Sequence, residues 1–266
     1  MTENNQTKFD ISALPVSKET GDALVKPVAA SIGNAGGTVL DGLFHLILDP
    51  VRKFNIQRQH ALEEFEKNIR ESVSEIPEEY LDHSKTGIVL KTLEDARYQL
   101  NEESIRDMFS QLVSATMDSR TNSKITPKYS SIIADMSPKE AVLLERIYHN
   151  MYSVVPVVNL RIRDSVTLSE RIFHLDMLLF DTGRDDTFPL ELSLLESANL
   201  ISLKEDFRLT SQHFEAIIDE YIGTFPPDLN NFFKGLLRNS NELISFQHSA
   251  YFLTELGRSF CSIVFE

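Results

Sequence analysis

The chain of 266 residues is 42% hydrophobic and 25% charged, and its 40 acidic against 26 basic side chains give a formal net charge of −14. This composition is typical of a globular protein and excludes wholesale disorder. The negative charge disfavours broad binding to nucleic acid, which depends on basic side chains that neutralise phosphates. Because Cys261 is the sole cysteine, an intrachain disulfide and a cysteine-rich zinc site are excluded, and a reducing compartment, the cytoplasm, is expected. The sequence has no phosphate-binding loop and no dinucleotide-binding fingerprint, so we expect neither a cofactor nor a metal.

Residues 1–17 are polar and predict a tail, and a glycine-rich helix is expected over residues 29–48. At about 100° per residue, the polar residues of this helix fall in one narrow wedge, so most of its circumference favours burial. Small residues spaced four apart form a stripe on which another backbone can pack closely. Pro50 ends or kinks the helix. The residues expected to contact a membrane or a second copy of the chain are Ala29, Gly33, Gly37, Leu40, Leu43, Phe44 and Ile47.

Two interpretations of the helix over residues 29–48 stand side by side. In the first, it is a core helix buried in the N-terminal bundle, since tertiary packing accounts for most apolar helices. In the second, it stays packed until infection frees it, and it then inserts into the inner membrane, lies along the membrane surface, or oligomerises through Gly33 and Gly37. Asp41 near its middle is costly in hydrocarbon, which favours a helix that lies along the membrane surface.

Periodic apolar residues predict further helices up to residue 150. Asn101 is the expected N-cap of one of them, and Thr126-Pro127 and Ser137-Pro138 mark the start of two more, because these residues suit a cap followed by a first turn. Residues 18–150 are therefore predicted to form one α-helical domain. The expected helices cover residues 51–75, 78–81, 86–99, 102–116, 127–135 and 138–150.

The pattern changes after residue 150. Residues 154–162 are rich in β-branched side chains and predict a strand or an extended linker. Residues 243–246 and 250–253 predict two short strands around a polar turn at 247–249. Helices are expected at 187–199, 210–222, 228–238 and 254–265, with a short strand at 200–203. Residues 151–266 thus predict a small winged-helix-like α+β domain, and the whole chain is predicted to be mainly α.

Several runs of residues stand out between positions 26 and 144: KPVAASIGNAGG, then LVSATM followed by a polar loop and a Thr-Pro helix, then MSPKEA. Together they resemble the Abi-alpha (abortive infection alpha) family of bacterial domains. NLISLKEDF and FLTELGRSF are similar to the terminal winged-helix part of such proteins, whereas residues 206–246 match nothing in the family pattern. The resemblance implies defence against phage and supplies no catalytic residue.

The run LLFDTGRDDT at residues 178–187 is similar to the Asp-Thr-Gly loop of retroviral-type aspartic proteases. Asp181 would be one catalytic carboxylate and a second copy of the chain would supply the other, because two aspartates must share a proton to activate water. The residues that follow predict a helix rather than the glycine-rich flap of those enzymes. An acidic surface turn is the alternative interpretation, and we expect a protein that is not an enzyme.

Two acidic groups are candidate metal sites. The aspartates between residues 176 and 186 offer oxygen ligands but lack the order of a calcium loop. His60 has Glu63 and Glu64 nearby, without the second histidine four residues away that a zinc protease requires. Solvated surface charge is the preferred interpretation of both groups.

Cys261 is interpreted as a small apolar side chain that fills space in the core.

Residues 181–266 include six basic and fourteen acidic side chains. DNA-binding domains concentrate positive charge, so we expect this part to contact protein rather than nucleic acid. Lys234 and Arg238 share one face if residues 228–238 are helical, and with Lys204 and Arg208 they keep a nucleic-acid-binding regulator as the alternative. The sequence therefore predicts a non-enzymatic phage-defence effector or sensor that acts with a protein partner from a defence operon, or at the membrane.

Overall fold

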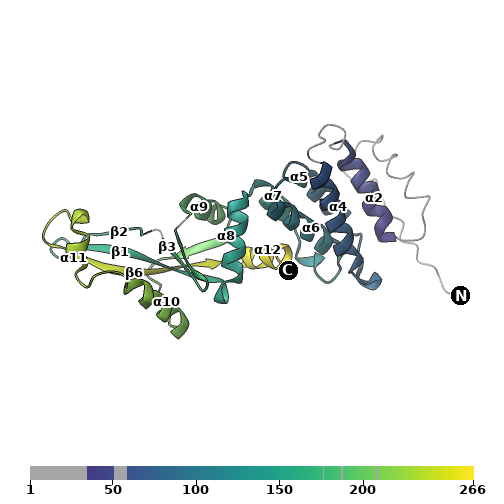
Figure 1. Cartoon of the computed structure of the whole chain (residues 1–266). Coiled ribbons are helices and arrows are strands. Elements are labelled where there is room, and N and C mark those ends of the chain that lie inside the picture. The colour runs from purple at the N-terminus through teal and green to yellow at the C-terminus, as the bar shows by residue number, and fades with distance from the viewer. Residues whose placement is uncertain (1–34, 51–58, 176, 187, 208) are drawn as a thin grey trace. The chain divides into compact units, whose positions relative to one another are not determined.

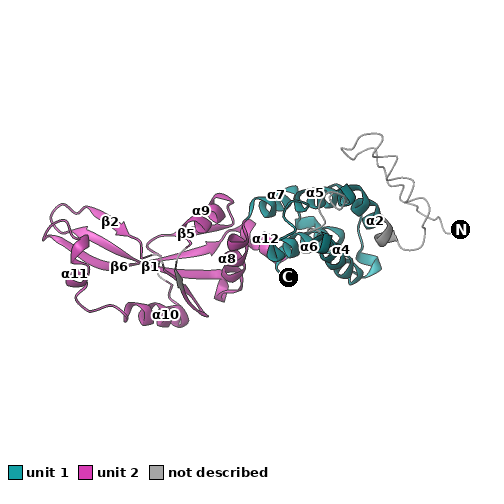
Figure 2. Ribbon diagram, turned by 45° about the horizontal axis from the view of Figure 1, so that its top comes forward, with its two compact units in different colours: residues 1–136, 263–266 teal, residues 137–262 magenta. Residues whose placement is uncertain are grey.

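The computed structural model describes residues 35–50, 59–175, 177–186, 188–207 and 209–266 (Figure 1). They form two compact units, which Figure 2 shows in different colours. Unit 1 holds the chain up to residue 136 together with residues 263–266, and unit 2 holds residues 137–262. The described residues combine many helices with one antiparallel sheet of six strands, so the fold is mixed α and β and mainly helical, as expected.

Unit 1 is a bundle of helices. Its helices and 3-10 turns are α2 (Ala35–Ile47), α4 (Gln59–Ser74), η3 (Glu78–Tyr80), α5 (Thr86–Ala96), α6 (Glu103–Met117), η4 (Asn122–Lys124) and α7 (Pro127–Asp135). Helix α6 contacts α4, α5 and α7, while α2 packs against α4 and α5. Phe65, Leu93 and Phe109 come from three different helices and are fully buried. Each such side chain contributes about 1.5–3 kcal/mol by its removal from water.

Unit 2 is a sheet with helices on both faces. Its strands are β1 (Val154–Asp164), β2 (Glu170–Phe173), β3 (Met177–Phe180), β4 (Gly183–Asp186), β5 (Ile201–Lys204) and β6 (Glu242–Leu253). Its helices and 3-10 turns are α8 (Pro138–His149), η5 (Met151–Ser153), α9 (Pro189–Ser197), α10 (Gln212–Ile222), α11 (Leu229–Phe232), η6 (Lys234–Leu236) and α12 (Glu255–Val264), the last of which ends in residues assigned to unit 1. The strand order is β4-β3-β1-β6-β5, and β2 pairs with the outer half of β1. Figures 1 and 2 show α10 on one side of the sheet and α9 on the other.

The prediction of two short strands around a turn at residues 247–249 is wrong. Strand β6 runs without interruption and pairs with β1 over the whole length of β1. Gln247 and Ser249 are buried in this ladder opposite Asn159 and Val157. Backbone pairing with a distant strand outweighs the turn preference of a polar run. The hairpin expected to form a wing is therefore one strand, and the winged-helix prediction is not confirmed.

The outer edge of β6 is partly covered by side chain and backbone. Strand β5 pairs only with residues 250–253, so within the described residues no strand lies beside residues 242–249 on that side. The Ile244 N–H there donates to the Asn230 side-chain oxygen at 2.8 Å, and the His248 carbonyl accepts from the Phe207 N–H at 3.0 Å. Two backbone groups of the edge are thereby paired without a further strand.

The expected N-cap is present at the start of α8 but not at the start of α6. Before α8, the Ser137 hydroxyl accepts from the Glu140 N–H, and the Glu140 carboxylate accepts from the Ser137 N–H at 2.9 Å, which is a capping box. Before α6, the prediction of Asn101 as N-cap is wrong, since Glu102 occupies that position without a side-chain capping bond. Asn101 lies instead in a turn closed by the Glu102 N–H and the Gln99 carbonyl.

Candidate functional site

Helix α2 carries the described part of the expected membrane or oligomer contact. Leu40, Leu43, Phe44 and Ile47 are all buried, with at most 6% of their surface exposed. The neighbours of α2 are α4 and α5, which pack against it within unit 1. Gly37 lies in the helix, and the other two expected positions, at 29 and 33, lie outside the described residues. In this state the apolar side of α2 is part of the bundle core.

The polar side of α2 is tied to α4 by one ion pair. Asp41 and Arg70 are 2.6 Å apart, and both side chains are about half exposed. The Arg70 guanidinium also lies 5.0 Å from the centre of the Phe44 ring, within the range of a cation–π interaction. His45 and Asp49 form a second contact at 2.8 Å within the same segment. Arg70 was not among the residues expected from the sequence, because its partner is far away along the chain.

The burial of α2 agrees with its interpretation as a core helix. It agrees equally with the resting state of a helix that leaves the bundle only after infection. The two interpretations differ only in whether α2 leaves the bundle, so the membrane contact stays a prediction. None of the helices in the described ranges is long and apolar enough to cross a bilayer.

Asp181 lies in the turn between β3 and β4, where it holds three segments of unit 2 together. One carboxylate oxygen accepts from the Met151 N–H at 2.7 Å, and the other lies 2.5 Å from Nε2 of His213 on α10. The Asp181 N–H donates to the Asn150 side-chain oxygen at 2.9 Å. Gly183 follows with a φ of 133°, which glycine tolerates best. These contacts are those of a structural anchor.

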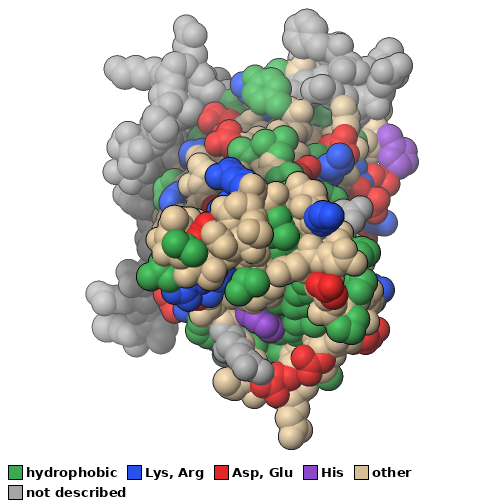
Figure 3. Space-filling model, turned by 90° about the vertical axis from the view of Figure 1, so that its left-hand side faces the viewer, with side chains coloured by type: hydrophobic (Ala, Val, Ile, Leu, Met, Phe, Trp, Pro, Cys, Tyr) green, Lys and Arg blue, Asp and Glu red, His purple; other side chains and the backbone are tan. Residues whose placement is uncertain are grey.

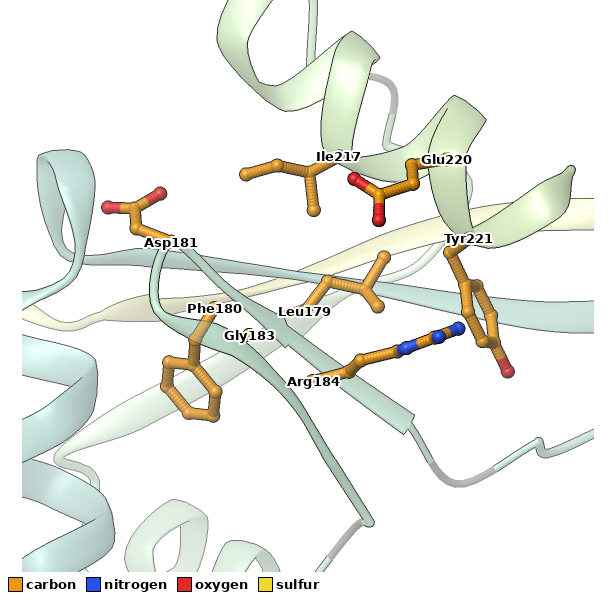
Figure 4. Close-up of a pocket in the computed structure, with 8 residues that line it drawn as sticks. All are labelled: Leu179, Phe180, Asp181, Gly183, Arg184, Ile217, Glu220 and Tyr221. Carbon is orange, nitrogen blue, oxygen red and sulfur yellow. The ribbon is translucent and has the colours of Figure 1, made fainter. Parts of the chain in front are cut away.

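A small cavity of about 120 Å³ lies between the β3–β4 hairpin and α10. Figure 4 shows Ile217, Glu220 and Tyr221 of the helix facing Leu179 and Arg184 of the hairpin. The Arg184 guanidinium lies 5.7 Å from the centre of the Tyr221 ring. Burial raises the pKa of the Tyr221 phenol. The cavity is small compared with most ligand sites.

Asp181→Asn is expected to leave phage protection near normal. An aspartic protease would lose its activity, because an amide cannot share the catalytic proton. An amide at 181 keeps one acceptor for the Met151 N–H or His213, so the cost is about 1 kcal/mol of unfolding free energy. Plaque counts on cells that express the variant measure protection, and thermal unfolding of the purified variant measures folding. A folded variant without protection would favour the protease.

The remaining candidates from the sequence are the two possible metal sites and Cys261. His60 is 3.5 Å from Glu64 in an exposed pair on α4. No cluster of three or more histidine, cysteine, aspartate or glutamate side chains suited to a metal occurs among the described residues. The side chains of the aspartates at 176, 185 and 186 are not among these. Cys261 is buried, and this burial raises the pKa of its thiol well above the ordinary range, which makes it a poor nucleophile.

The fold and these contacts define a protein with a helical bundle, which includes α2, and an antiparallel sheet unit covered by helices. A family model described as abortive infection alpha (Abi_alpha) matches residues 57–264, and the chain belongs to this family. The match includes residues 206–246, which the sequence resemblance leaves unassigned, and it begins after α2. No curated protein and no solved structure matches the chain. Membership indicates a role in abortive infection, a form of defence against phage.

Proposed function

We propose that this protein is a phage-defence effector or sensor that has no catalytic step of its own and acts through helix α2. At rest, α2 is held against α4 and α5. Infection, signalled by a protein partner from the same defence operon, frees α2, which then binds the inner membrane peripherally or a second copy of the chain. Family membership supports the defence role, and the packing of α2 supports the mode of action.

This proposal rests on helix α2, whose apolar side is buried and whose polar side contacts α4 through the exposed Asp41–Arg70 ion pair. Leu40, Leu43 and Phe44 are buried, so release of α2 would expose a continuous apolar strip. The Asp41–Arg70 pair is half exposed, and such pairs contribute only about 0–1 kcal/mol to stability. Elements that move in regulated proteins come from the less stable part of a structure. Helix α2, which packs against α4 and α5, is proposed to be such an element.

Freed α2 is expected to lie along the membrane surface. Asp41 on its polar side would be costly in the hydrocarbon layer. Asp41 and His45 then stay with water and headgroups, while the apolar side chains enter the interface. The net charge of −14 opposes the approach to anionic lipid, so apolar burial must supply most of the binding.

Arg70→Glu is expected to release α2 without infection. The change converts attraction to Asp41 into repulsion and removes the cation beside the Phe44 ring. The expected loss is roughly 1–2 kcal/mol, which raises the released fraction about tenfold. Cells that express the variant should grow more slowly without phage, and the share of the protein in the membrane fraction should rise about tenfold over wild type.

Two further variants serve as controls for Arg70→Glu. Lys67→Glu makes the same change of charge on the same helix, but Lys67 pairs with Glu71 at 3.7 Å, so growth should stay normal. The double variant Asp41→Arg with Arg70→Glu restores opposite charges and should restore growth. The proposal fails if folded Arg70→Glu protein stays soluble and its cells grow like the wild type.

The nucleic-acid alternative draws less support from the geometry. The helix expected over residues 228–238 is broken into α11 and η6, and Leu237 is extended. Lys234 and Arg238 therefore do not share a helix face, which corrects that expectation. Lys204 lies 4.6 Å from the Phe252 ring on the sheet. We therefore keep a protein partner or the membrane as the proposed target.

A further inference from the structure

Strand β2 forms an open edge of the sheet in unit 2. It pairs with β1 on one side, and among the residues that the structure describes no strand pairs with its other side. Figures 1 and 2 both show β2 at the margin of the sheet. Its four residues are half-buried or exposed, and Phe173 is 41% exposed. This edge is therefore accessible to another chain.

The pairing with β1 determines which backbone groups of β2 point outward. The Asp164 N–H donates to the Ser169 carbonyl at 3.0 Å, so these two residues form a hydrogen-bonded pair of the ladder. Such pairs alternate along an antiparallel ladder, so the backbone groups of Arg171 and Phe173 point at β1. The N–H and C=O of Ile172 point outward, and neither has a hydrogen-bond partner within the described ranges.

Other edges of the same sheet are capped by side chains. On β6, the Ile244 N–H donates to the Asn230 side-chain oxygen at 2.8 Å. On β5, the Leu203 N–H donates to the Glu196 carboxylate at 2.9 Å. Natural sheets protect exposed edges by devices of this kind, because an open edge pairs with other chains. The uncapped edge of β2 therefore indicates a partner strand.

The two charged side chains of β2 already have partners within unit 2. Glu170 lies 3.4 Å from Arg163 and 3.9 Å from Arg161, and Arg171 lies 2.9 Å from Glu242. These charges therefore oppose the approach of a strand less than unpaired charges would. Figure 3 looks at this unit end-on, and basic, acidic and hydrophobic side chains are interspersed on the face that it shows.

The sequence of β2 is complementary to itself in one antiparallel register. When Ile172 lies opposite Ile172 of a second copy, Glu170 lies opposite His174, the residue that follows the strand. Arg171 then lies opposite Phe173 on the other face of the sheet. A carboxylate opposite an imidazole N–H and a guanidinium beside a ring are both favourable cross-strand pairs. A register centred on Glu170 or on Arg171 instead places like charges opposite each other.

We propose that β2 pairs with β2 of a second copy of this chain about a two-fold axis at Ile172, which joins the two sheets edge to edge. The outward N–H and C=O of the two Ile172 residues then bond to each other as a hydrogen-bonded pair. The same edge is used on both copies, so the assembly closes at a dimer. Since β2 has only four residues, we expect a weak dimer that forms at high protein concentration. This dimer does not rest on the release of α2.

Analytical ultracentrifugation of the full-length chain over about a hundredfold range of concentration measures the dimer. Ile172→Pro removes the outward N–H, and proline is tolerated in an edge strand where the N–H faces solvent. This variant should raise the dissociation constant of the dimer at least tenfold and should unfold at the same temperature as the wild type. Ile172→Val is the matched control, because it keeps the N–H and a β-branched side chain, and it should dimerise like the wild type.

Cysteine cross-linking of the full-length chain tests the register. Ile172→Cys brings two thiols together at the axis, since the Cα atoms of a hydrogen-bonded pair lie about 5.5 Å apart, within the range of a disulfide. Phe173→Cys is the control, because its two copies are diagonal neighbours at about 7–8 Å, although Phe173 is the more exposed residue. The native Cys261 is buried. Under mild oxidation, Ile172→Cys should form the disulfide dimer at least tenfold faster than Phe173→Cys.

A wild-type chain that stays monomeric at every concentration would overturn the proposal. So would Ile172→Pro protein that dimerises like the wild type, or cross-linking through Phe173→Cys as fast as through Ile172→Cys. Arg70→Glu should leave the cross-linking of Ile172→Cys unchanged, because α2 takes no part in this contact. A dimer that forms only when Arg70→Glu is present would assign the contact to α2 and would likewise overturn the proposal.

Discussion

Gly257→Ala is expected to destabilise unit 2 by about 3 kcal/mol or more and to reduce the yield of soluble protein. A methyl group at this position would lie 2.0 Å from the Leu200 carbonyl oxygen, which is backbone and cannot change rotamer. The same carbonyl accepts from the Thr254 N–H at 2.9 Å, and this bond joins the start of α12 to the start of β5. Overpacking usually costs about 1–3 kcal/mol, and a clash with backbone belongs at the upper end or beyond.

Chemical denaturation followed by circular dichroism measures this loss. Gly87→Ala is the control, because a methyl group added there meets no atom within 4 Å. Gly87 lies in α5, so its replacement should raise the free energy of unfolding by about 0.5–1 kcal/mol. Equal stability of Gly257→Ala and wild type would show that the α12 contact is looser than the structure indicates.

Phe109→Ala is expected to lower the free energy of unfolding of unit 1 by about 3–5 kcal/mol. Phe109 is fully buried on α6, which contacts three other helices, so truncation removes apolar burial and leaves a cavity at the centre of the bundle. Urea denaturation of the purified variant measures the effect. Tyr98→Ala is the comparison, since Tyr98 is largely exposed and its loss should cost less than about 1 kcal/mol. A loss below about 1 kcal/mol for Phe109→Ala would mean that the bundle core is poorly packed.

Local periodicity explains why the helices of unit 1 were predictable. Leu62, Phe65 and Ile69 recur at helical spacing and all lie buried on α4. The capping box at Ser137 likewise needs only residues close in sequence. A local sequence pattern is sufficient to predict a helix, because its backbone hydrogen bonds join residues only four positions apart.

The parts that escaped prediction depend on residues far apart in the chain. The central residues of β6 are polar and predict a turn, and only pairing with β1 keeps them extended. The partners of Asp41 and Asp181 are Arg70 and His213, which no local motif connects to them. Likewise, the broad apolar surface of α2 predicts burial, but it does not indicate whether the helical bundle or lipid covers that surface. Contacts of this kind follow from the tertiary fold.

The paired edge of β6 has a consequence for the state of the protein in a crowded cell. An open strand edge is a template on which other chains add, and the risk grows with concentration. Asn230 and Phe207 occupy the backbone groups of Ile244 and His248, so an incoming strand would have to displace both before it could form a continuous ladder. Edge protection of this kind raises the kinetic barrier to edge-to-edge aggregation.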